Sequence, residues 1–340
     1  MSDEYRIGED AIDREINSIT KKYSRFQNRE LIRQLFTTIV KLYLDEADER
    51  DLYLANVTLK ELRHVFRVFS KYRHVRKVVI FGSHKTPLKS AEYKQAQEFS
   101  EKIVKAGYMV ITGGGGGIME AGNRGANDKG FAIKIKLPLE AEPNVYVKKG
   151  EQLVNVHYFF TRKLAFIKES DATVLFPGGF GTHDEGFEVL TLLQTGKTIP
   201  RPIVMIEPKG STYWSNWLKF VNKELLRFGY VTKDDYSLFK IVNTVDAAVK
   251  EINAFYHAYH SIKYGKPLSV IRLNFQLPEK KLKELSKKYK DILVSGEIKP
   301  SGPLSSEVRA KELLHLPRIS LHFNMKSYNR LVALIKDLKP

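Results

Sequence analysis

The sequence contains no cysteine among its 340 residues and no long apolar run. Without cysteine there can be no disulfide, no thiolate nucleophile and no cysteine-ligated zinc site. No apolar run approaches the roughly 20 residues that a membrane-spanning helix requires. The first ten residues, MSDEYRIGED, are acidic and polar, which is not the pattern of a secretory signal. Together these absences predict a cytoplasmic protein that does not enter the membrane.

Two common nucleotide-binding motifs are also missing. Five consecutive glycines at residues 113–117 do not fit G-x-G-x-x-G in any register, because no glycine stands at residues 118–120. Residues 196–198 read Gly-Lys-Thr, but Thr191 occupies the position where a triphosphate-binding loop needs its first glycine. The sequence therefore argues against a dinucleotide site and against a triphosphate site of these kinds.

Basic charge and an adequate supply of apolar residues are what the sequence does contain. The formal net charge is +17, and 43% of the residues are hydrophobic. A chain of this length predicts two or three domains with proper cores. The positive charge is compatible with anionic ligands, nucleic acid among them, and equally with a lysine-rich solvated surface.

The order of apolar segments predicts an α/β fold, specifically a Rossmann-like, doubly wound and mostly parallel sheet. Strands and helices alternate through residues 76–262, as is typical of such a sheet. Helical periodicity over residues 1–75 predicts an N-terminal helical segment. Residues 263–340 predict a small C-terminal α+β appendage, for which a ferredoxin-like arrangement is one option.

A strand, a glycine loop and a helix follow one another near the middle of the chain. The apolar run Ala172–Phe176 predicts a buried strand, and apolar spacing over residues 187–193 predicts a helix. Between them, the amides of residues 177–182 and the helix N-terminus would hold an anion such as a phosphate. A second glycine turn follows the strand that ends at Thr112. Both turns are expected at the carboxyl ends of their strands, where doubly wound sheets bind ligands.

The loop carries a family resemblance. Pro177-Gly178-Gly179-x-Gly181-Thr182-x-x-Glu185 resembles the PGGxGTxxE motif of the Lonely Guy (LOG) family, whose members were long described as lysine decarboxylases. The resemblance extends to residues 112–120 (TGGGGGIME), to residues 79–83 (VIFGS) and to the pair Arg162-Lys163, and it spans roughly residues 76–255. It implies an enzyme of the larger bacterial type that hydrolyses nucleoside 5′-monophosphates to free base and ribose 5-phosphate. The role implied is general nucleotide turnover, with activation of cytokinin nucleotides, the other role within the family, as the alternative. The resemblance implies neither a metal nor a cofactor.

By this resemblance Glu185 and Arg162 are the catalytic residues. Hydrolysis of an N-glycosidic bond passes through an oxocarbenium-like sugar, so it needs a carboxylate and a group that helps the base to leave. Glu185 would contact the ribose, and Arg162 would lie near the base or the sugar. The plainer alternatives are a helix-dipole acid for Glu185 and a solvated helix residue for Arg162.

The other candidate residues divide between the phosphate and the rest of the substrate. Those expected to hold the phosphate through backbone amides and a hydroxyl are Gly178, Gly179, Gly181 and Thr182, although such glycines also simply make a tight turn. Those expected around the sugar and the base are Ser83, Gly114, Gly115, Gly117, Glu120 and Lys163. Glu120 equally fits a helix cap, and Lys163 equally fits the surface. His183 would reach the pocket only as a less common outcome for a first-turn histidine.

Other functions stay open. The same loops would suit a non-catalytic carrier of a phosphorylated ligand such as molybdenum cofactor, which related folds carry. An anionic effector or nucleic acid would meet the basic C-terminal region at Lys280, Lys281, Lys283, Lys287, Lys288 and Lys290. Most of these lysines cannot share one helix face, so nucleic acid is not an expected partner. A decarboxylase would need a Schiff-base lysine with its pyridoxal site, and no motif supports one. The resemblance also implies a homo-oligomer, at least a dimer.

Overall fold

The computed structural model describes residues 5–22, 28–136, 142–148 and 150–339. By its contacts the chain divides into two compact units, residues 1–63 and residues 64–340. We describe each unit by itself.

The first unit is helical, as predicted. Its helices are α1 (Asp10–Lys22), α2 (Arg29–Leu44) and most of α3 (Glu49–Phe69), which continues into the second unit. Acidic residues occupy the first turn of α1 and lysines its last turn, an arrangement that complements the helix dipole. On α2 the guanidinium of Arg33 forks onto the carboxylate of Glu30 over 2.9 and 2.6 Å, a pairing that stabilises one turn of helix.

Seven parallel strands form the central sheet of the second unit, in the order β4-β3-β2-β1-β5-β6-β7. The strands are β1 (Lys77–Phe81), β2 (Met109–Thr112), β3 (Gly130–Ile135), β4 (Leu153–Val156), β5 (Ala172–Leu175), β6 (Ile203–Ile206) and β7 (Phe239–Val242). The inner strands are buried along their whole length, because helices cover both faces of a parallel sheet. The predicted Rossmann-like, doubly wound sheet is confirmed.

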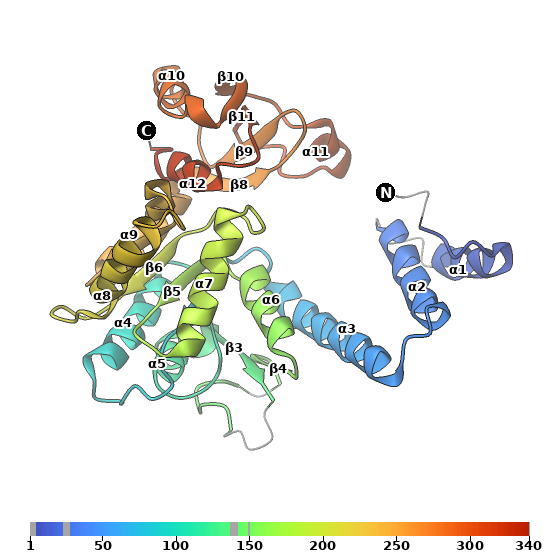
Figure 1. Cartoon of the computed structure of the whole chain (residues 1–340), viewed down its shortest axis with the longest axis horizontal. Coiled ribbons are helices and arrows are strands. Elements are labelled where there is room, and N and C mark those ends of the chain that lie inside the picture. The colour runs from blue at the N-terminus through green and yellow to red at the C-terminus, as the bar shows by residue number, and fades with distance from the viewer. Residues whose placement is uncertain (1–4, 23–27, 137–141, 149, 340) are drawn as a thin grey trace. The chain divides into compact units, whose positions relative to one another are not determined.

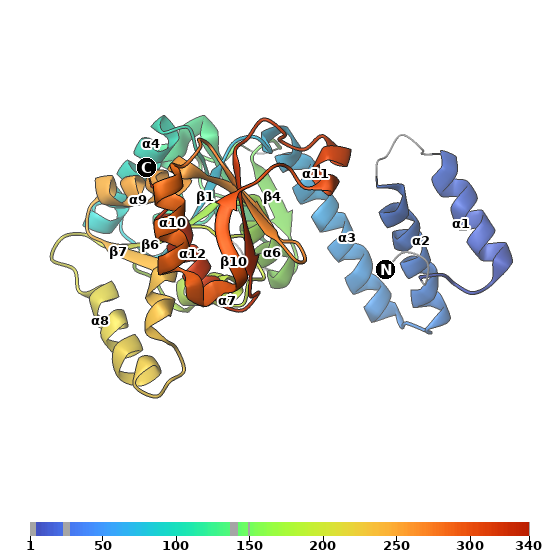
Figure 2. The ribbon, with the colours of Figure 1, turned by 90° about the horizontal axis from the view of Figure 1, so that it is seen from above.

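Helices cover the two faces of this sheet (Figures 1 and 2). On one face α4 (Ala91–Lys105) packs against both α5 (Ile118–Ala126) and α9 (Val245–Ala258). On the other face α6 (Phe159–Glu169) and α7 (Phe180–Gln194) lie side by side. The chain reaches the opposite face because it leaves the edge strand β4 and returns to the middle of the sheet at β5.

Shorter helical segments connect these elements. Helix α8 (Tyr213–Phe220) runs on into a π-helical segment, Val221–Leu226. The remaining segments are 3-10 turns at Ser70–Tyr72, Asn127–Lys129, Lys233–Leu238 and Lys290–Ile292.

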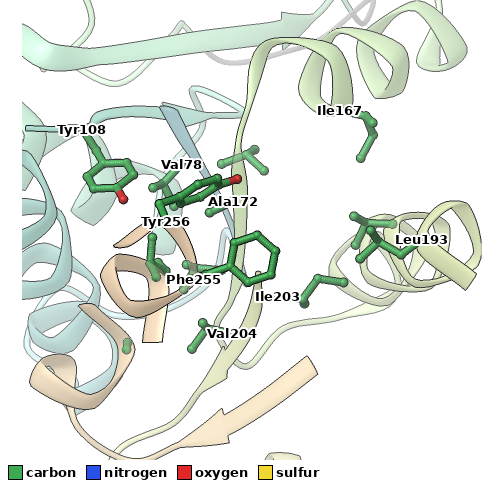
Figure 3. Packing of buried hydrophobic residues seen from close by; sticks show 14 of the residues in the cluster. Val78, Tyr108, Ile167, Ala172, Leu193, Ile203, Val204, Phe255 and Tyr256 are labelled. Atoms are coloured by element: carbon green, nitrogen blue, oxygen red, sulfur yellow. The ribbon is translucent and has the colours of Figure 1, made fainter. Parts of the chain in front are cut away.

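The hydrophobic core lies on both sides of the sheet, as Figure 3 shows. Phe255 and Tyr256 of α9 pack on one side of Ala172 in β5, and Ile167 of α6 and Leu193 of α7 lie on the other side. All five side chains are buried. The Tyr256 hydroxyl donates a 2.6 Å hydrogen bond to the carbonyl of Asp171, so this polar group is satisfied within the core.

The strand order reverses between β1 and β5. From β1 the chain moves outward in one direction through β2, β3 and β4, and from β5 it moves outward in the other through β6 and β7. In doubly wound sheets a crevice forms beyond the carboxyl ends of the strands at such a reversal. Here the two strand ends are tied together: the Ser83 amide donates to the Pro177 carbonyl over 3.1 Å. The turn after β1 and the glycine loop after β5 therefore lie side by side.

A second sheet of four antiparallel strands has the order β10-β11-β9-β8. Its strands are β8 (Tyr259–Lys263), β9 (Ser269–Leu273), β10 (Leu293–Pro300) and β11 (Arg318–Phe323), and its helices are α10 (Glu279–Lys288), α11 (Ser305–Ala310) and α12 (Tyr328–Lys336). The β9-α10-β10 connection spans β11, which is the split β-α-β unit of ferredoxin-like folds. The outer strand β8 precedes this unit in the sequence.

Helix α12 joins the two sheets of the second unit. It packs against α7, against α9 and against the 3-10 turn Lys233–Leu238. Its first residue, Tyr328, lies directly under Gly196, where an added Cβ would come within 2.1 Å of the Tyr328 ring. Gly196 also has φ +68°, a conformation that favours glycine. Figure 1 shows α12 beside α9.

The second sheet contains a buried ion network. Glu307 of α11 is completely buried, and its Oε1 accepts from Arg272 Nε over 2.7 Å and from Arg318 Nη2 over 3.4 Å. Its Oε2 accepts from the Leu304 amide over 2.6 Å, and Glu312 pairs with the other side of Arg272 over 2.8 Å. These contacts fix α11 and the segment after it against the sheet.

Among the described residues, none of the helices combines the length and the apolar character that crossing a bilayer requires.

Candidate active site

A cavity of about 470 Å³ opens where the strand order reverses. Its walls come from the turn after β1, from the start of the glycine run after β2, from α6, and from the loop and first turn of α7. Half of the predicted site residues line it, namely Ser83, Arg162, Gly179, Gly181, Thr182 and Glu185. They come from three segments of the chain, of which the first, at Ser83, and the last, at residues 179–185, are more than 90 residues apart. The sheet brings these segments together.

The loop after β5 forms one wall and the start of α7. Gly179 is the residue before the helix, and the amides of Thr182 and His183 donate to its carbonyl over 3.0 and 3.2 Å. The amides that precede these in a first helical turn have no intrahelical acceptor. Because Gly179 and Gly181 have open space where a Cβ would be, an anion can approach the backbone there.

Gly178 acts behind this wall and does not line the cavity. A Cβ on Gly178 would lie 2.1 Å from Thr182 Oγ1 and 2.9 Å from the Ser83 amide, so only glycine fits between the two loops. Its carbonyl accepts a hydrogen bond from the Tyr213 hydroxyl. Gly178 therefore sets the close approach of the loops, while Gly179 and Gly181 face the space between them.

Glu185 lies in the first turn of α7, with its side chain buried. Only 7% of the residue is exposed, and Oε2 has no hydrogen-bond partner among the described residues. Burial raises the pKa of Glu185 to about 7, although the positive charges of Lys163 and Arg162 oppose the shift. A carboxyl group with such a pKa exchanges its proton near neutrality, as acid–base catalysts do.

Arg162 reaches the cavity from α6 and is held in one orientation. Its Nε donates to the Ile133 carbonyl over 2.9 Å, and its Nη2 donates to the Gly113 carbonyl over 3.3 Å. The guanidinium carbon lies 5.2 Å from the centre of the Phe166 ring, which supports the cation from below. Gly113 must be glycine, because a Cβ there would lie 2.3 Å from Arg162 Nη2.

Lys163 does not line the cavity. Its Nζ pairs with Asp184 Oδ2 and with Glu188 Oε2, each at 2.9 Å, and so links α6 to α7. Burial lowers the pKa of Lys163, but the hydrogen bonds that its ammonium donates to these two carboxylates outweigh this effect and raise the pKa overall. Lys163 acts on the cavity as a nearby positive charge that opposes the raised pKa of Glu185.

The glycines after β2 mostly pack behind the cavity and do not line it. Gly113 alone among them lines the cavity, whereas Gly114, Gly115 and Gly117 lie away from it. Gly117 has φ +61°, and a Cβ there would lie 2.3 Å from the Ser83 carbonyl, so it lets α5 begin directly against the turn after β1. The Ile118 amide donates to that same carbonyl over 3.0 Å.

Glu120 also lies outside the cavity lining. Its Oε1 accepts a hydrogen bond from the Tyr93 hydroxyl over 3.2 Å, which ties α5 to α4. In the structure as described, this side chain serves helix packing.

His183 packs on the far side of the loop. Its Nε2 lies 2.7 Å from the Tyr213 hydroxyl, and its ring stacks 5.9 Å from that of Phe187. Since the Tyr213 proton goes to Gly178, His183 Nε2 must be the donor in this pair. Burial lowers the pKa of His183, so the neutral Nε2–H form is expected at neutral pH.

Several lining residues escaped the sequence analysis. His84 and Lys85 follow Ser83 directly and bring basic side chains to the cavity. Met119, Phe159 and Phe180 also line the cavity, and the two phenylalanines have 54% and 96% of their surface exposed. The rule that ligands bind just after a strand would have found His84 and Lys85, because they follow β1 as the glycine loop follows β5.

The fold and the cavity together define a class of protein. It is a Rossmann-like α/β protein with a glycine loop, a buried carboxyl group and a fixed arginine around one cavity.

Comparisons with known proteins place the chain more closely. Residues 115–252 match the family described as possible lysine decarboxylase. A probable cytokinin riboside 5′-monophosphate phosphoribohydrolase of rice, LOGL5, is 30% identical over 154 residues, 44% of this chain and 60% of its own length. The phosphoribohydrolase LOG3 of Arabidopsis thaliana is 24% identical over 184 residues, 53% of this chain and 83% of its own length. An uncharacterized protein of Archaeoglobus fulgidus is 30% identical over 117 residues, 34% of this chain and 74% of its own.

The similarity to the LOG family that the sequence motifs predicted is confirmed by this family model and by relatives named as LOG phosphoribohydrolases. It spans 60% of the length of the rice relative. Among solved structures, the molybdenum cofactor binding protein of the phototrophic bacterium Rippkaea orientalis is 19% identical, with a TM-score of 0.37 over 53% of this chain and 95% of that one.

Proposed function

We propose that the cavity hydrolyses nucleoside 5′-monophosphates to a free base and ribose 5-phosphate. The observation that carries the proposal is Glu185, a buried carboxyl group whose Oε2 has no hydrogen-bond partner within the described part of the chain and whose pKa is raised to about 7. It lines the same cavity as an anion-binding loop and a fixed guanidinium. The names of the curated relatives support this reaction class.

The phosphate is assigned to the start of α7. Backbone amides at Gly179 and Gly181 and the Thr182 side chain line the cavity at a helix N-terminus, where negative charge is favoured. Ser83 and Lys85 face the same space from the turn after β1. Holding the phosphate fixes the sugar, so that binding energy away from the reacting bond positions the anomeric carbon.

Glu185 is assigned to the reacting sugar. When the N-glycosidic bond breaks, its electron pair leaves with the base and positive charge develops on the ribose. The ionised carboxylate stabilises that charge and takes a proton from the attacking water, which adds its oxygen to the anomeric carbon. The low exposure of Glu185 strengthens this electrostatic effect, because little water screens it.

Arg162 is assigned to the leaving side of the reaction. Two backbone carbonyls and the Phe166 ring hold its guanidinium in place, so no reorganisation is needed when negative charge builds on the base. Met119 and Phe159 offer an apolar contact for a heterocycle at the same cavity. The base itself is left open by these residues, because none of them is matched to one hydrogen-bonding edge.

The test is a panel of the common nucleoside 5′-monophosphates incubated with the full-length chain, with free base separated and measured by chromatography. We expect release of base and an equal amount of ribose 5-phosphate from at least one nucleotide. Nucleosides without the 5′-phosphate should be poor substrates, because they lack the group that fixes the sugar. The matched control is Glu185→Gln, which keeps the shape of the side chain.

Binding without release would reverse the conclusion. If nucleotides protect the chain against thermal unfolding but no base appears, the cavity is a carrier site for a phosphorylated ligand, the alternative that the sequence left open. Self-association and a cytoplasmic location stay predictions, as does an anionic effector at the basic helix α10.

A further inference from the structure

A second cavity, of about 280 Å³, lies between the two sheets of the second unit. We call it the junction cavity. It is enclosed by β7, α9, the 3-10 turn Lys233–Leu238 and the end of α12, and it shares no lining residue with the candidate active site. None of the family motifs reaches these residues, so the proposed reaction leaves the junction cavity without a role.

Three lysines face the junction cavity, which are Lys240, Lys336 and Lys339. Lys336 is the least exposed of them, and among the described residues its carboxylate partner is Glu251, with Oε1 at 3.2 Å. Lys240 and Lys339 form no ion pair with any described residue. Burial lowers the pKa of Lys336, and the charges of the other two lysines lower it further. All three lysines line the same cavity, so their charges add to its positive potential.

The acidic groups at the junction cavity do not balance this charge. Glu251 is paired with Lys336. The second acid, Asp337, is already engaged outside the junction cavity, because its Oδ2 accepts from Lys288 Nζ and from the Tyr289 hydroxyl, each at 2.6 Å. A hollow that groups lysines in this way stabilises a negative ligand, since like charges at short range are unfavourable unless an anion lies between them.

An aromatic wall completes the junction cavity. Tyr236 and Phe239 contribute rings whose centres lie 5.9 Å apart, whereas Phe255, also in the lining, is almost wholly buried in the core. A purely inorganic ion would not use these surfaces, whereas a small organic molecule that carries a phosphate would place its carbon skeleton against them. The charged and apolar parts of the junction cavity therefore indicate an amphiphilic ligand.

We propose that the junction cavity binds a small phosphate-bearing metabolite. Its phosphate is held by the ammonium groups of Lys240, Lys336 and Lys339, and its organic part lies against the aromatic wall. A phosphate suits three ammonium donors better than a carboxylate does, because it offers more acceptor oxygens and up to two charges.

The test measures binding to the full-length chain by isothermal titration calorimetry at constant ionic strength. The probes are inorganic phosphate, pyrophosphate and ribose 5-phosphate. The variant Lys240→Ala/Lys339→Ala removes the two lysines without an ion pair. Its matched control is Lys94→Ala/Lys105→Ala, which removes the same charge from two lysines of α4 that are exposed, as Lys240 and Lys339 are. Thr182→Val in the glycine loop separates binding at the candidate active site.

We expect at least one probe to bind the Lys240→Ala/Lys339→Ala variant about tenfold or more weakly than it binds the wild type and the α4 control, because two charge-assisted contacts are lost. Tighter binding of ribose 5-phosphate than of inorganic phosphate would support the role of the aromatic wall, and the reverse order would overturn it. Hydrogen exchange should slow in α9 and α12 when the probe is added. Equal affinities in all three lysine backgrounds, or protection confined to residues 178–185, would overturn the proposal.

Discussion

Glu185 and Glu307 are both buried carboxyl groups, and the chain surrounds them with opposite chemistry. Glu307 accepts hydrogen bonds from two arginines and one backbone amide. Burial alone would raise the pKa of Glu307, but these donors outweigh it and the pKa is lowered. No residue that the structure describes donates a hydrogen bond to Glu185 Oε2, and burial raises the pKa of Glu185 to about 7.

The difference shows how the same residue serves structure in one sheet and chemistry in the other. A satisfied buried carboxylate stays ionised and fixes its surroundings, as Glu307 fixes α11. An unsatisfied one costs stability, so its retention in a cavity indicates a use for it, because ligands or transition states supply the missing contacts. The predictions below challenge this contrast in order of decreasing effect.

The largest effect is expected for Glu185→Gln on turnover. The amide cannot take a proton from water or carry the negative charge that stabilises the ribose, so kcat/KM should fall by about 10²–10⁴-fold. The measurement is initial-rate release of free base from the best nucleotide of the panel. Glu188→Gln on the same helix is the control, since that acid pairs with Lys163 and does not line the cavity. Equal losses in both variants would contradict a special role for Glu185.

The next effect is expected for Glu307→Gln on stability. Removal of the charge leaves Arg272 and Arg318 buried without their shared anion, which typically costs about 3–5 kcal/mol. Urea unfolding followed by circular dichroism measures the loss. Glu312→Gln should cost about 1 kcal/mol or less, because that carboxylate is 41% exposed and water replaces it. If the two variants lose the same free energy, burial of the ion network is not what stabilises α11.

The third effect is a gain of stability on Glu185→Gln, opposite to the loss expected for Glu307→Gln. The pKa of Glu185 rises from 4.5 to about 7 on folding, so the folded state holds this proton more tightly than the unfolded state does. Stability is therefore unaffected below pH 4.5 and is lost as the pH rises from there to about 7. Glu185→Gln should remove this loss and raise the free energy of unfolding at pH 8 by up to about 3 kcal/mol. The variant should gain little at pH 4.5, and a loss of stability at pH 8 would show that Glu185 has a partner in solution.

A fourth effect concerns the rate of the wild type. If the ionised form of Glu185 is the active one, kcat/KM should rise about tenfold between pH 6 and pH 8 and level off above that, because the pKa of the free enzyme is about 7. A series of buffers at constant ionic strength measures the profile. A rate that falls over this range would assign Glu185 the role of proton donor instead.

The sequence predicted the fold well because its signals are local and repeated. Apolar runs followed by glycine turns marked β1, β2 and β5, and their alternation with helices was enough for a doubly wound sheet. The short strands β4 and β8 escaped notice, since each is only partly buried and has polar residues interspersed. The change from α8 to a π-helix at Val221 is likewise not indicated by any apolar spacing.

The site was predictable only in part. The motif gave Glu185, Arg162 and the loop, but not that Lys163 pairs with acids on α7, because that contact depends on two helices lying side by side. The glycine run did not indicate that Gly117 packs against the turn after β1. That contact is with the backbone of Ser83, 34 residues earlier in the chain, so the local pattern cannot show it. Nothing in the sequence pattern pointed to the unpartnered oxygen of Glu185, which arises from packing alone.

The smallest effect is expected for Tyr213→Phe. Tyr213 forms hydrogen bonds with the loop beside Glu185, as the two arginines form hydrogen bonds with Glu307. Its hydroxyl donates to the Gly178 carbonyl and accepts from His183 Nε2 at 2.7 Å. Tyr213→Phe leaves both without this partner, at a cost of about 1 kcal/mol. Because Gly178 positions the loop assigned to the phosphate, we expect a rise of about fivefold in KM with kcat nearly unchanged, by the conversion of 1.4 kcal/mol per tenfold.

Tyr256→Phe is the matched control for this loop contact. The Tyr256 hydroxyl also donates to a backbone carbonyl, that of Asp171, but at the opposite end of β5 from the glycine loop. Both variants should therefore lose similar stability to heat, since each removes one buried hydroxyl, and only Tyr213→Phe should raise KM. A KM that rises equally in both would mean that general loosening of β5, and not the hold on Gly178, sets the affinity for the phosphate. The hydrogen bonds of Tyr213 would then stabilise the fold, as those of Glu307 do, without affecting substrate binding.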